Sequence, residues 1–259
     1  MDLLFFQLFL FCLALFANTL SAFAGGGAGL VQLPLLILLG LPFSVALATH
    51  KVASVFLGIG ASIRHSQEKS LKPVYVLLIL ACGLPGVFSG ASVVLSIPED
   101  ISLIFLGILT FSIGFYSSSN SQLGIKDTQI KYTKLHLLVG GVVLFFLGFL
   151  NGSFSSGTGL FVTLWLVRWF GISYTKAIGY TLVLVGLFWN GTGALVLGLN
   201  GKIQWNWLPM LLLGSFTGGY LGSHFSLLKG NKLVKLSFEI ICISVGIALL
   251  LRGILNLTY

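Results

Sequence analysis

The sequence carries very little charge. Only 8% of its 259 residues are Asp, Glu, Lys or Arg, whereas soluble domains carry about a quarter. No polar stretch is long enough to form a soluble domain, and the dyad alternation of transmembrane β-strands is missing. Apolar runs recur instead along nearly the whole chain, and most are long enough to span a bilayer. The composition therefore predicts one all-α polytopic membrane domain over residues 1–259.

Cysteines and ligand motifs are equally sparse. The three cysteines, Cys12, Cys82 and Cys242, stand singly inside apolar runs, which suits small apolar filler and supports neither a disulfide nor a metal site. No phosphate-cradling nucleotide motif is present. We therefore expect no cofactor and no metal. The net charge of +8 comes from lysines in short loops, so it indicates membrane orientation and not a nucleic-acid partner.

The apolar segments form two sets of five. The first set covers residues 3–24, 29–40, 44–63, 73–90 and 101–118; the second covers 135–150, 158–171, 174–198, 206–227 and 236–256. The first segment ends in "SAFA", as a cleaved signal peptide could, but "MDLL" lacks a basic residue, which favours a membrane helix.

The two sets resemble each other. "GAGLVQLPLLILLGLPFSVALA" at 27–48 aligns with "GTGLFVTLWLVRWFGISYTKAIG" at 157–179, with one residue inserted. The sequence therefore predicts an internal duplication, with a first repeat at 1–118, a cytoplasmic linker at 119–134 and a second repeat at 135–259.

Loop charges predict how the two repeats are oriented. Basic residues gather in 64–72, 119–134 and 228–235, whereas 91–100 and 199–205 hold almost none. If basic loops face the cytoplasm, loops 64–72 and 199–205 lie on opposite sides although they are equivalent. The sequence thus predicts two inverted repeats of about five segments each, in a multi-pass protein of the cytoplasmic (inner) membrane, an arrangement typical of alternating-access carriers.

Two segments, 29–40 and 158–171, are too short to cross. At 1.5 Å per residue they reach about 20 Å, against about 30 Å of hydrocarbon, so we expect broken or re-entrant helices. Glycine-rich stretches precede both. Such breaks are tolerated only inside protein or beside a polar cavity, and corresponding breaks in two halves indicate a substrate site.

Each break is followed by a new helix, whose N-terminal amides favour an anion. The predicted binding residues at the breaks are Gly25, Gly26, Gly27 and Gly29 in the first repeat and Asn151, Ser153, Ser155, Ser156, Gly157 and Thr158 in the second. Alternatively, the glycines only let helices pack closely.

Charge inside a membrane segment is the second indication of a site. "ATHKVAS" puts Thr49, His50 and Lys51 two turns into an apolar helix, and an intramembrane lysine is a functional candidate. Lys51 could offset an anion's charge, and His50 could carry a coupled proton; snorkelling to the interface is the alternative. Further candidates are Gln32, Tyr180, Thr181 and Asn190.

These motifs resemble the TauE/SafE family of sulfite and organosulfonate permeases. The resemblance is carried by "GGGAGL…P", "GLPFSVALATHK", "NGSFSSGTGL" and "GISYTKAIGYT", and it extends over essentially the whole chain. It implies transport of small sulfur-containing anions, namely sulfite, sulfoacetate or aryl sulfonates.

We therefore expect a secondary transporter for a small oxyanion, surrounded by lipid and not an enzyme. Two alternatives stay open: an anion channel, and an intramembrane hydrolase in which "SFSSG" at 153–157 pairs with His50 or His224,. The substrate, the direction of transport, the coupling ion and a possible homodimer are left open by the sequence.

Overall fold

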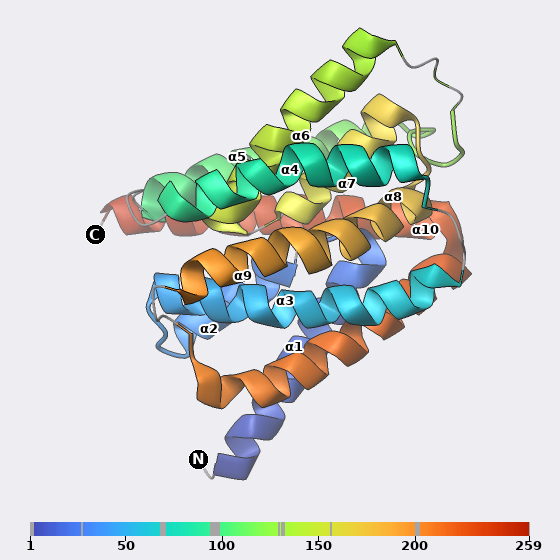
Figure 1. Ribbon diagram of the computed structural model, residues 1–259. Coiled ribbons are helices and arrows are strands. Elements are labelled where there is room, and N and C mark those ends of the chain that lie inside the picture. The colour runs from blue at the N-terminus through green and yellow to red at the C-terminus, as the bar shows by residue number, and fades with distance from the viewer. Residues whose placement is uncertain are drawn as a thin grey trace.

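A computed structural model describes residues 3–26, 28–67, 71–93, 99–128, 130, 133–155, 157–199 and 203–258. All regular structure in these ranges is helical (Figure 1). The predicted first repeat contains the helices α1 (Leu3–Ala24), α2 (Ala28–Leu38), α3 (Phe43–Ser66), α4 (Pro73–Val93) and α5 (Glu99–Ser118). The expected all-α membrane architecture is confirmed.

The predicted second repeat begins at α6. It contains α6 (Lys134–Phe154), α7 (Thr158–Phe170) and a long helix made of three consecutive parts, α8 (Tyr174–Tyr180), the π-helix η2 (Thr181–Trp189) and α9 (Asn190–Gly198). A short 3₁₀ turn, η3 (Trp205–Trp207), leads into α10 (Leu208–Thr258).

Six helices are long and apolar enough to cross a membrane, counted over the described residues. The last of them, 51 residues long, is interrupted at Gly230, where φ is 77° and ψ is 173°. Figure 1 shows the chain reversing at this end of the bundle, so α10 consists of two antiparallel helices joined at Gly230. By contrast, α2 and α7 have 11 and 13 residues and are too short to cross.

Two helices that the predicted duplication pairs as equivalents run in opposite directions. In Figure 1, α3 runs from left to right, whereas the α8–η2–α9 helix beside it runs from right to left. Contacts between the repeats are also reciprocal: a Cβ atom on Gly114 of α5 would lie 3.0 Å from the side chain of Ile243, and one on Gly246 would lie 2.7 Å from that of Phe111. Both pairs of partners are related by the same sequence offset of 132 residues.

Small residues bring the long helices close together. A Cβ atom on Gly86 or Gly90 of α4 would lie 2.1 Å from a carbonyl oxygen of α6, and one on Gly218 or Gly222 of α10 would lie 2.7 Å or 2.3 Å from a carbonyl oxygen of α1. Contacts this close fit the small-residue packing of membrane helices. These four glycines therefore serve helix packing.

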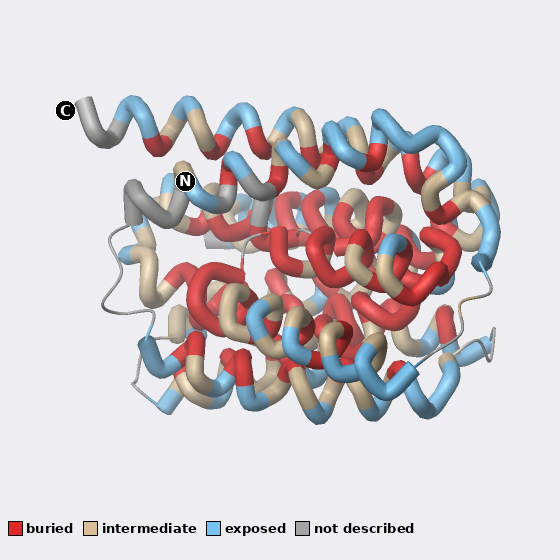
Figure 2. The backbone as a smooth tube through the Cα atoms, turned by 90° about the horizontal axis from the view of Figure 1, so that it is seen from above, coloured by how far each residue is buried: buried red, intermediate tan, exposed pale blue. Residues whose placement is uncertain are grey.

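Burial separates an inner and an outer region of the bundle. Figure 2 shows buried positions concentrated on the central helices and the inward faces of the others. The outward faces carry large apolar side chains such as Leu4, Phe16, Leu77, Phe88 and Leu138, each more than half exposed. An apolar outer surface of this kind is expected where helices face lipid.

Candidate substrate site

The two glycine-rich breaks meet inside the bundle. A Cβ atom added to Gly26 would lie 2.8 Å from the Cα atom of Gly159, so the two backbones touch. The hydroxyl of Thr163 in α7 also donates to the carbonyl oxygen of Gly25 at 2.6 Å. Gly25 and Gly26 have φ values of 104° and 111°, which favour glycine. Segments 130 residues apart thereby form one site.

A small cavity lies where the breaks meet. Its volume is about 40 Å³, room for about three waters at 10–15 Å³ each. The break regions and their helices contribute Ser21, Gly26, Ala28, Gly29, Asn151, Ser155, Thr158 and Gly159; α3 contributes His50, Ser54 and Leu57; η2 and α9 contribute Thr181, Leu182, Val185, Gly186 and Asn190. Both repeats therefore build its wall.

The N-terminus of α7 faces this cavity. Its N-cap is Gly157, with φ of 71°, and no side chain caps it. Ser155, just before it, has φ of 59°, an uncommon conformation for a residue other than glycine. The first amides of a helix have no intrahelical acceptor, so Thr158 and Gly159 present donors and the positive end of the helix dipole.

Lys51 lies directly behind the cavity wall and is fully buried. Its ammonium group donates to the carbonyl oxygen of Asn151 at 2.7 Å and lies 3.3 Å from the side-chain oxygen of the same residue. The Asn151 amide in turn donates to the Thr158 hydroxyl at 2.9 Å. No carboxylate pairs with Lys51 among the described residues. The cation therefore stands one residue away from the cavity without a neutralising acid.

Lys51 also has a structural role. Asn151 belongs to the last turn of α6, where the helix dipole favours a cation. Gly193 leaves room for the lysine stem, because a Cβ atom there would lie 2.7 Å from the Cδ atom of Lys51. Snorkelling does not describe this geometry, since the ammonium group points into the protein.

Two cavity residues have polar atoms with no hydrogen-bond partner among the described residues. These are the Nδ1 atom of His50 and the side-chain oxygen of Asn190. The other ring nitrogen of His50 lies 3.2 Å from the Ser54 hydroxyl, one turn along α3. Because buried polar groups are almost always paired, these two atoms indicate where a ligand or water binds.

The structure places eight predicted residues on the cavity wall and three just behind it. On the wall are Gly26, Gly29, His50, Asn151, Ser155, Thr158, Thr181 and Asn190; behind it are Gly25, Lys51 and Gly157. Gly27 and Ser156 lie outside the described residues.

Four predicted residues are elsewhere. Gln32 accepts from Asn18 at 3.0 Å in a separate buried cluster. Thr49 donates to the carbonyl of Val45 and accepts from Gln204. Ser153 binds the Gly90 and Phe149 carbonyls between α4 and α6, and the Tyr180 hydroxyl accepts from the backbone amide of Lys72. In a helix, neighbouring residues point in different directions, so adjacency to Lys51 or Ser155 does not place a side chain in the cavity.

Several wall residues were missed by sequence reasoning. Ser54 lies four residues after His50, on the same helix face, so its place could have been predicted. Ser21 precedes the first break by one turn. Thr163, behind the wall, could not be found, because its two partners, Gly25 and Thr181, are 138 and 18 residues away in the sequence.

Among the described residues, no serine of 153–157 forms a hydrogen bond with His50 or His224, as the hydrolase alternative would require. His224 accepts from the Nε atom of Arg64 at 3.2 Å, at the end of the bundle where α3 finishes. Ser153 donates to backbone carbonyls, and His50 hydrogen-bonds to Ser54 in its own helix.

Comparisons with known proteins point to membrane transport. The profile of the sulfite exporter TauE/SafE family matches residues 10–249. A probable membrane transporter protein of Haemophilus influenzae is 31% identical over 87% of both chains. The probable membrane transporter protein YfcA of Escherichia coli K12 is 33% identical over 87% of this chain and 82% of its own. No solved structure matches the chain.

Proposed function

The chain belongs to the sulfite exporter TauE/SafE family, and we propose that it is a secondary transporter that moves a small sulfur-containing oxyanion across the cytoplasmic membrane. Sulfite, sulfoacetate and other organosulfonates are the candidate substrates. The site comprises the cavity between the two breaks. The observation that carries the proposal is the contact of Gly26 with Gly159, because it joins both breaks at one polar cavity.

The electrostatics of the cavity suit an anion. The amides at the start of α7 point at it, and the Lys51 ammonium stands behind Asn151 without an acidic partner among the described residues. No Asp or Glu is among the residues of its wall. A negative ligand would therefore be attracted by both a helix dipole and a buried charge.

The size of the cavity favours a small member of the substrate class. Space for about three waters suits the four heavy atoms of sulfite better than an aryl sulfonate. A larger sulfonate would require the wall to move, since Leu182, Val185 and Leu57 form its apolar part.

The architecture supports alternating access as the mechanism of transport. Inverted repeats commonly serve this mechanism in carriers; the opposite directions of α3 and the α8–η2–α9 helix and the reciprocal Gly114 and Gly246 contacts support such repeats here. Movement of one repeat against the other would expose the cavity to each side in turn. His50, with one unpaired nitrogen at the cavity, is the candidate carrier of a coupled proton.

The test is transport by purified protein in proteoliposomes. Labelled sulfite, sulfoacetate and an aryl sulfonate are offered in turn, with and without a pH gradient, and empty liposomes serve as control. We expect saturable sulfite uptake that accelerates when unlabelled sulfite is preloaded. Flux without saturation or counterflow would favour the anion channel, and the absence of transport and binding of all three anions would reject the substrate class.

A further inference from the structure

A second, larger cavity opens at the end of the bundle that carries the basic loops. Its volume is about 560 Å³, and we call it the vestibule. It lies at the C-terminal end of α7, the helix whose N-terminus faces the substrate cavity. Its walls are formed by Lys72, Tyr75, Asp127, Thr128, Ile130, Phe170, Gly171, Ile172, Lys176 and Tyr180.

The vestibule carries a net positive charge. Lys72 and Lys176 contribute two cations and Asp127 one anion. Lys176 forms an ion pair with Asp127, and both side chains are about half exposed. Burial raises the pKa of the Asp127 carboxyl, but hydrogen bonds from Lys176 and Ser173 outweigh burial, so that its pKa lies below the usual range. The Asp127 carboxylate therefore stays ionised at every pH above the ordinary pKa of an aspartate side chain.

Buried aromatic rings form part of the vestibule wall. The ring of Tyr180 packs edge-on against Tyr75 at 5.6 Å, and Tyr75 packs against Phe170 at 5.5 Å. Tyr180 is 1% exposed. The next residue, Thr181, belongs to the wall of the substrate cavity. Along this helix, a residue of the vestibule wall is thus followed directly by a residue of the substrate cavity.

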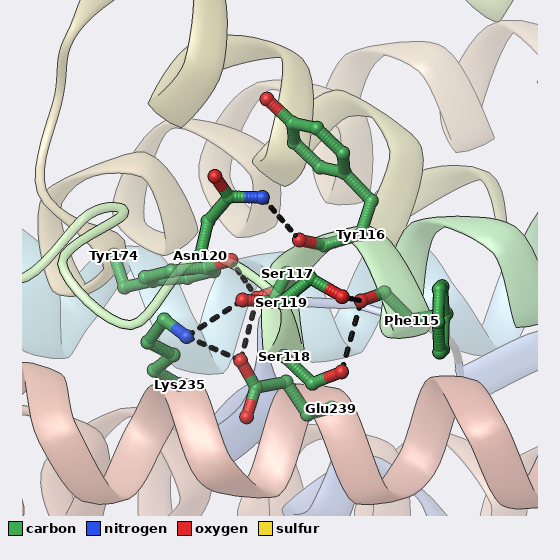
Figure 3. Close-up of polar contacts among 9 residues, drawn as sticks. All are labelled: Phe115, Tyr116, Ser117, Ser118, Ser119, Asn120, Tyr174, Lys235 and Glu239. Atoms are coloured by element: carbon green, nitrogen blue, oxygen red, sulfur yellow. Dashed lines mark hydrogen bonds and ion pairs between the residues drawn. The ribbon is translucent and has the colours of Figure 1, made fainter.

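Helix α8, which carries Tyr180, is held firmly at its start. Asp127 accepts from the Ser173 amide at 2.8 Å, and Asn231 accepts from the Thr175 amide at 2.9 Å. Figure 3 shows the Tyr174 hydroxyl beside Ser117, which also contacts Glu239 of α10. These contacts fix α8 to α5, α10 and the linker.

The segment beyond Tyr180 has a different character. The π-helix η2 begins at Thr181, and π-helical turns are rare and concentrate at functional sites. Tyr180 is therefore the last residue of an anchored α-helix and borders a segment whose hydrogen bonding can rearrange. A side chain at such a junction is suited to open and close a passage.

We infer that the vestibule is the cytoplasmic entrance subsite for the anion and that Tyr180 is the gate between it and the substrate cavity. This inference rests on the proposed function. Lys72 and Lys176 attract the anion to the entrance, and the rings of Tyr180 and Tyr75 keep it out of the cavity until they separate. Asp127 limits the attraction by neutralising Lys176.

The gate is tested without any substrate. Thr181→Cys is made in the full chain, and inverted membrane vesicles are treated with a membrane-impermeant thiol reagent, with labelling at position 181 followed by mass spectrometry. We expect slow labelling that becomes at least tenfold faster when Tyr180→Ala is added. Tyr75→Ala, which removes the ring partner, should accelerate it as well and serves if the first variant does not fold.

Phe188→Ala is the matched control for the gate, since Phe188 is a large, 46% exposed side chain in the same π-helix. It should leave the labelling rate unchanged. Equal rates with and without Tyr180 and Tyr75 would overturn the gate, and so would faster labelling from the opposite face of the membrane.

The entrance is tested by charge changes of opposite sign. A unit charge about 10 Å from an ion in water changes its local concentration about twofold. Lys72→Gln and Lys176→Gln should therefore each raise the KM for sulfite on the cytoplasmic face about twofold, whereas Asp127→Asn should lower it by a similar factor. Lys229→Gln, on the same end of the bundle but outside the vestibule, is the control.

Three conditions sharpen this second test. The effects should vanish at about 1 M salt, where charges are screened within about 3 Å, and should be missing when sulfite is offered on the other face. With sulfoacetate, whose charge is nearly constant over this range, the Asp127→Asn effect should be the same at pH 8 and pH 5.5, because the lowered pKa keeps Asp127 ionised at both. Equal changes on both faces, or none on either, would reject the entrance. If the wild-type protein moves no sulfur anion, the proposed function fails, and the labelling rates alone decide on the gate.

Discussion

Replacing Lys51 by methionine separates its two roles. The substitution keeps the apolar stem and most of the volume while removing the charge and the hydrogen bonds to Asn151. The free energy of unfolding depends on the hydrogen bonds and burial of the ammonium group, whereas anion binding depends on its charge. A structural lysine and a substrate-binding lysine therefore give different results.

Stability should change little. Hydrogen bonds to a charged group contribute about 1.5–3 kcal/mol, but burying an ammonium group costs several kcal/mol, and methionine removes both terms. We expect the free energy of unfolding to change by less than about 2 kcal/mol.

Transport should change much more. Two successive hydrogen bonds place an anion that binds the Asn151 amide about 6 Å from the ammonium group. At an effective dielectric constant of about 20, their attraction is about 2.8 kcal/mol, which corresponds to about 100-fold in affinity. Lys51→Met should therefore weaken sulfite binding about 100-fold while the protein remains folded.

The assay combines sulfite binding by isothermal calorimetry with thermal unfolding in the same detergent. Lys232→Met, a lysine two residues after the helix junction at Gly230, controls for the loss of net charge. Unchanged affinity in Lys51→Met, with an unfolding temperature like that of the wild type, would refute the reasoning. Lys51 would then serve only the end of α6.

Two glycine substitutions extend the same reasoning. Gly193→Ala should weaken sulfite binding at least tenfold, because the new Cβ atom meets the stem of Lys51 at 2.7 Å, whereas Gly191→Ala, whose nearest neighbour is at 3.9 Å, should bind normally in the same calorimetric assay. Gly26→Ala should lower the unfolding temperature more than Gly40→Ala: both have positive φ, but a Cβ atom has nothing within 4 Å at Gly40, so only Gly26→Ala forces the two breaks apart. Equal shifts for the last pair would show that backbone strain alone matters there.

The helical plan could be predicted from sequence because membrane segments are set by local composition. Long apolar runs predicted the long spans, and glycine clusters predicted the interruptions at Gly25–Gly26 and at Gly157. Segments 206–227 and 236–256 appear as one 51-residue helix, but the positive φ at Gly230 divides it where the loop was expected. Each of these features depends only on residues that are close together in the sequence.

The site could be predicted only in part, because its contacts join residues far apart in the chain. Lys51 was recognised as unusual, yet its partner Asn151 is 100 residues away. Tyr180 was assigned to the substrate site from its position in the repeat, but its side chain points to the vestibule. The direction in which side chains point next to a π-helix cannot be predicted from a pattern that assumes 3.6 residues per turn.

The π-helix explains how the two predicted repeats, which differ in length, could build one cavity. "GIGA" at 58–61 and "GTGA" at 191–194 are 133 residues apart, whereas Ala48 and Gly179, before them, are 131 apart, so the second repeat gains two residues in between. In an unbroken α-helix two extra residues would rotate everything after them by about 200°, which would turn Gly193 and Asn190 away from Lys51 and the cavity. Hydrogen bonds from i to i+5 take up extra residues within the turns, and η2 lies in this interval. The matching stretch of α3 is an ordinary α-helix. The helix without the insertion, α3, therefore supplies the cation and the histidine, and the helix with it supplies the π-helical wall.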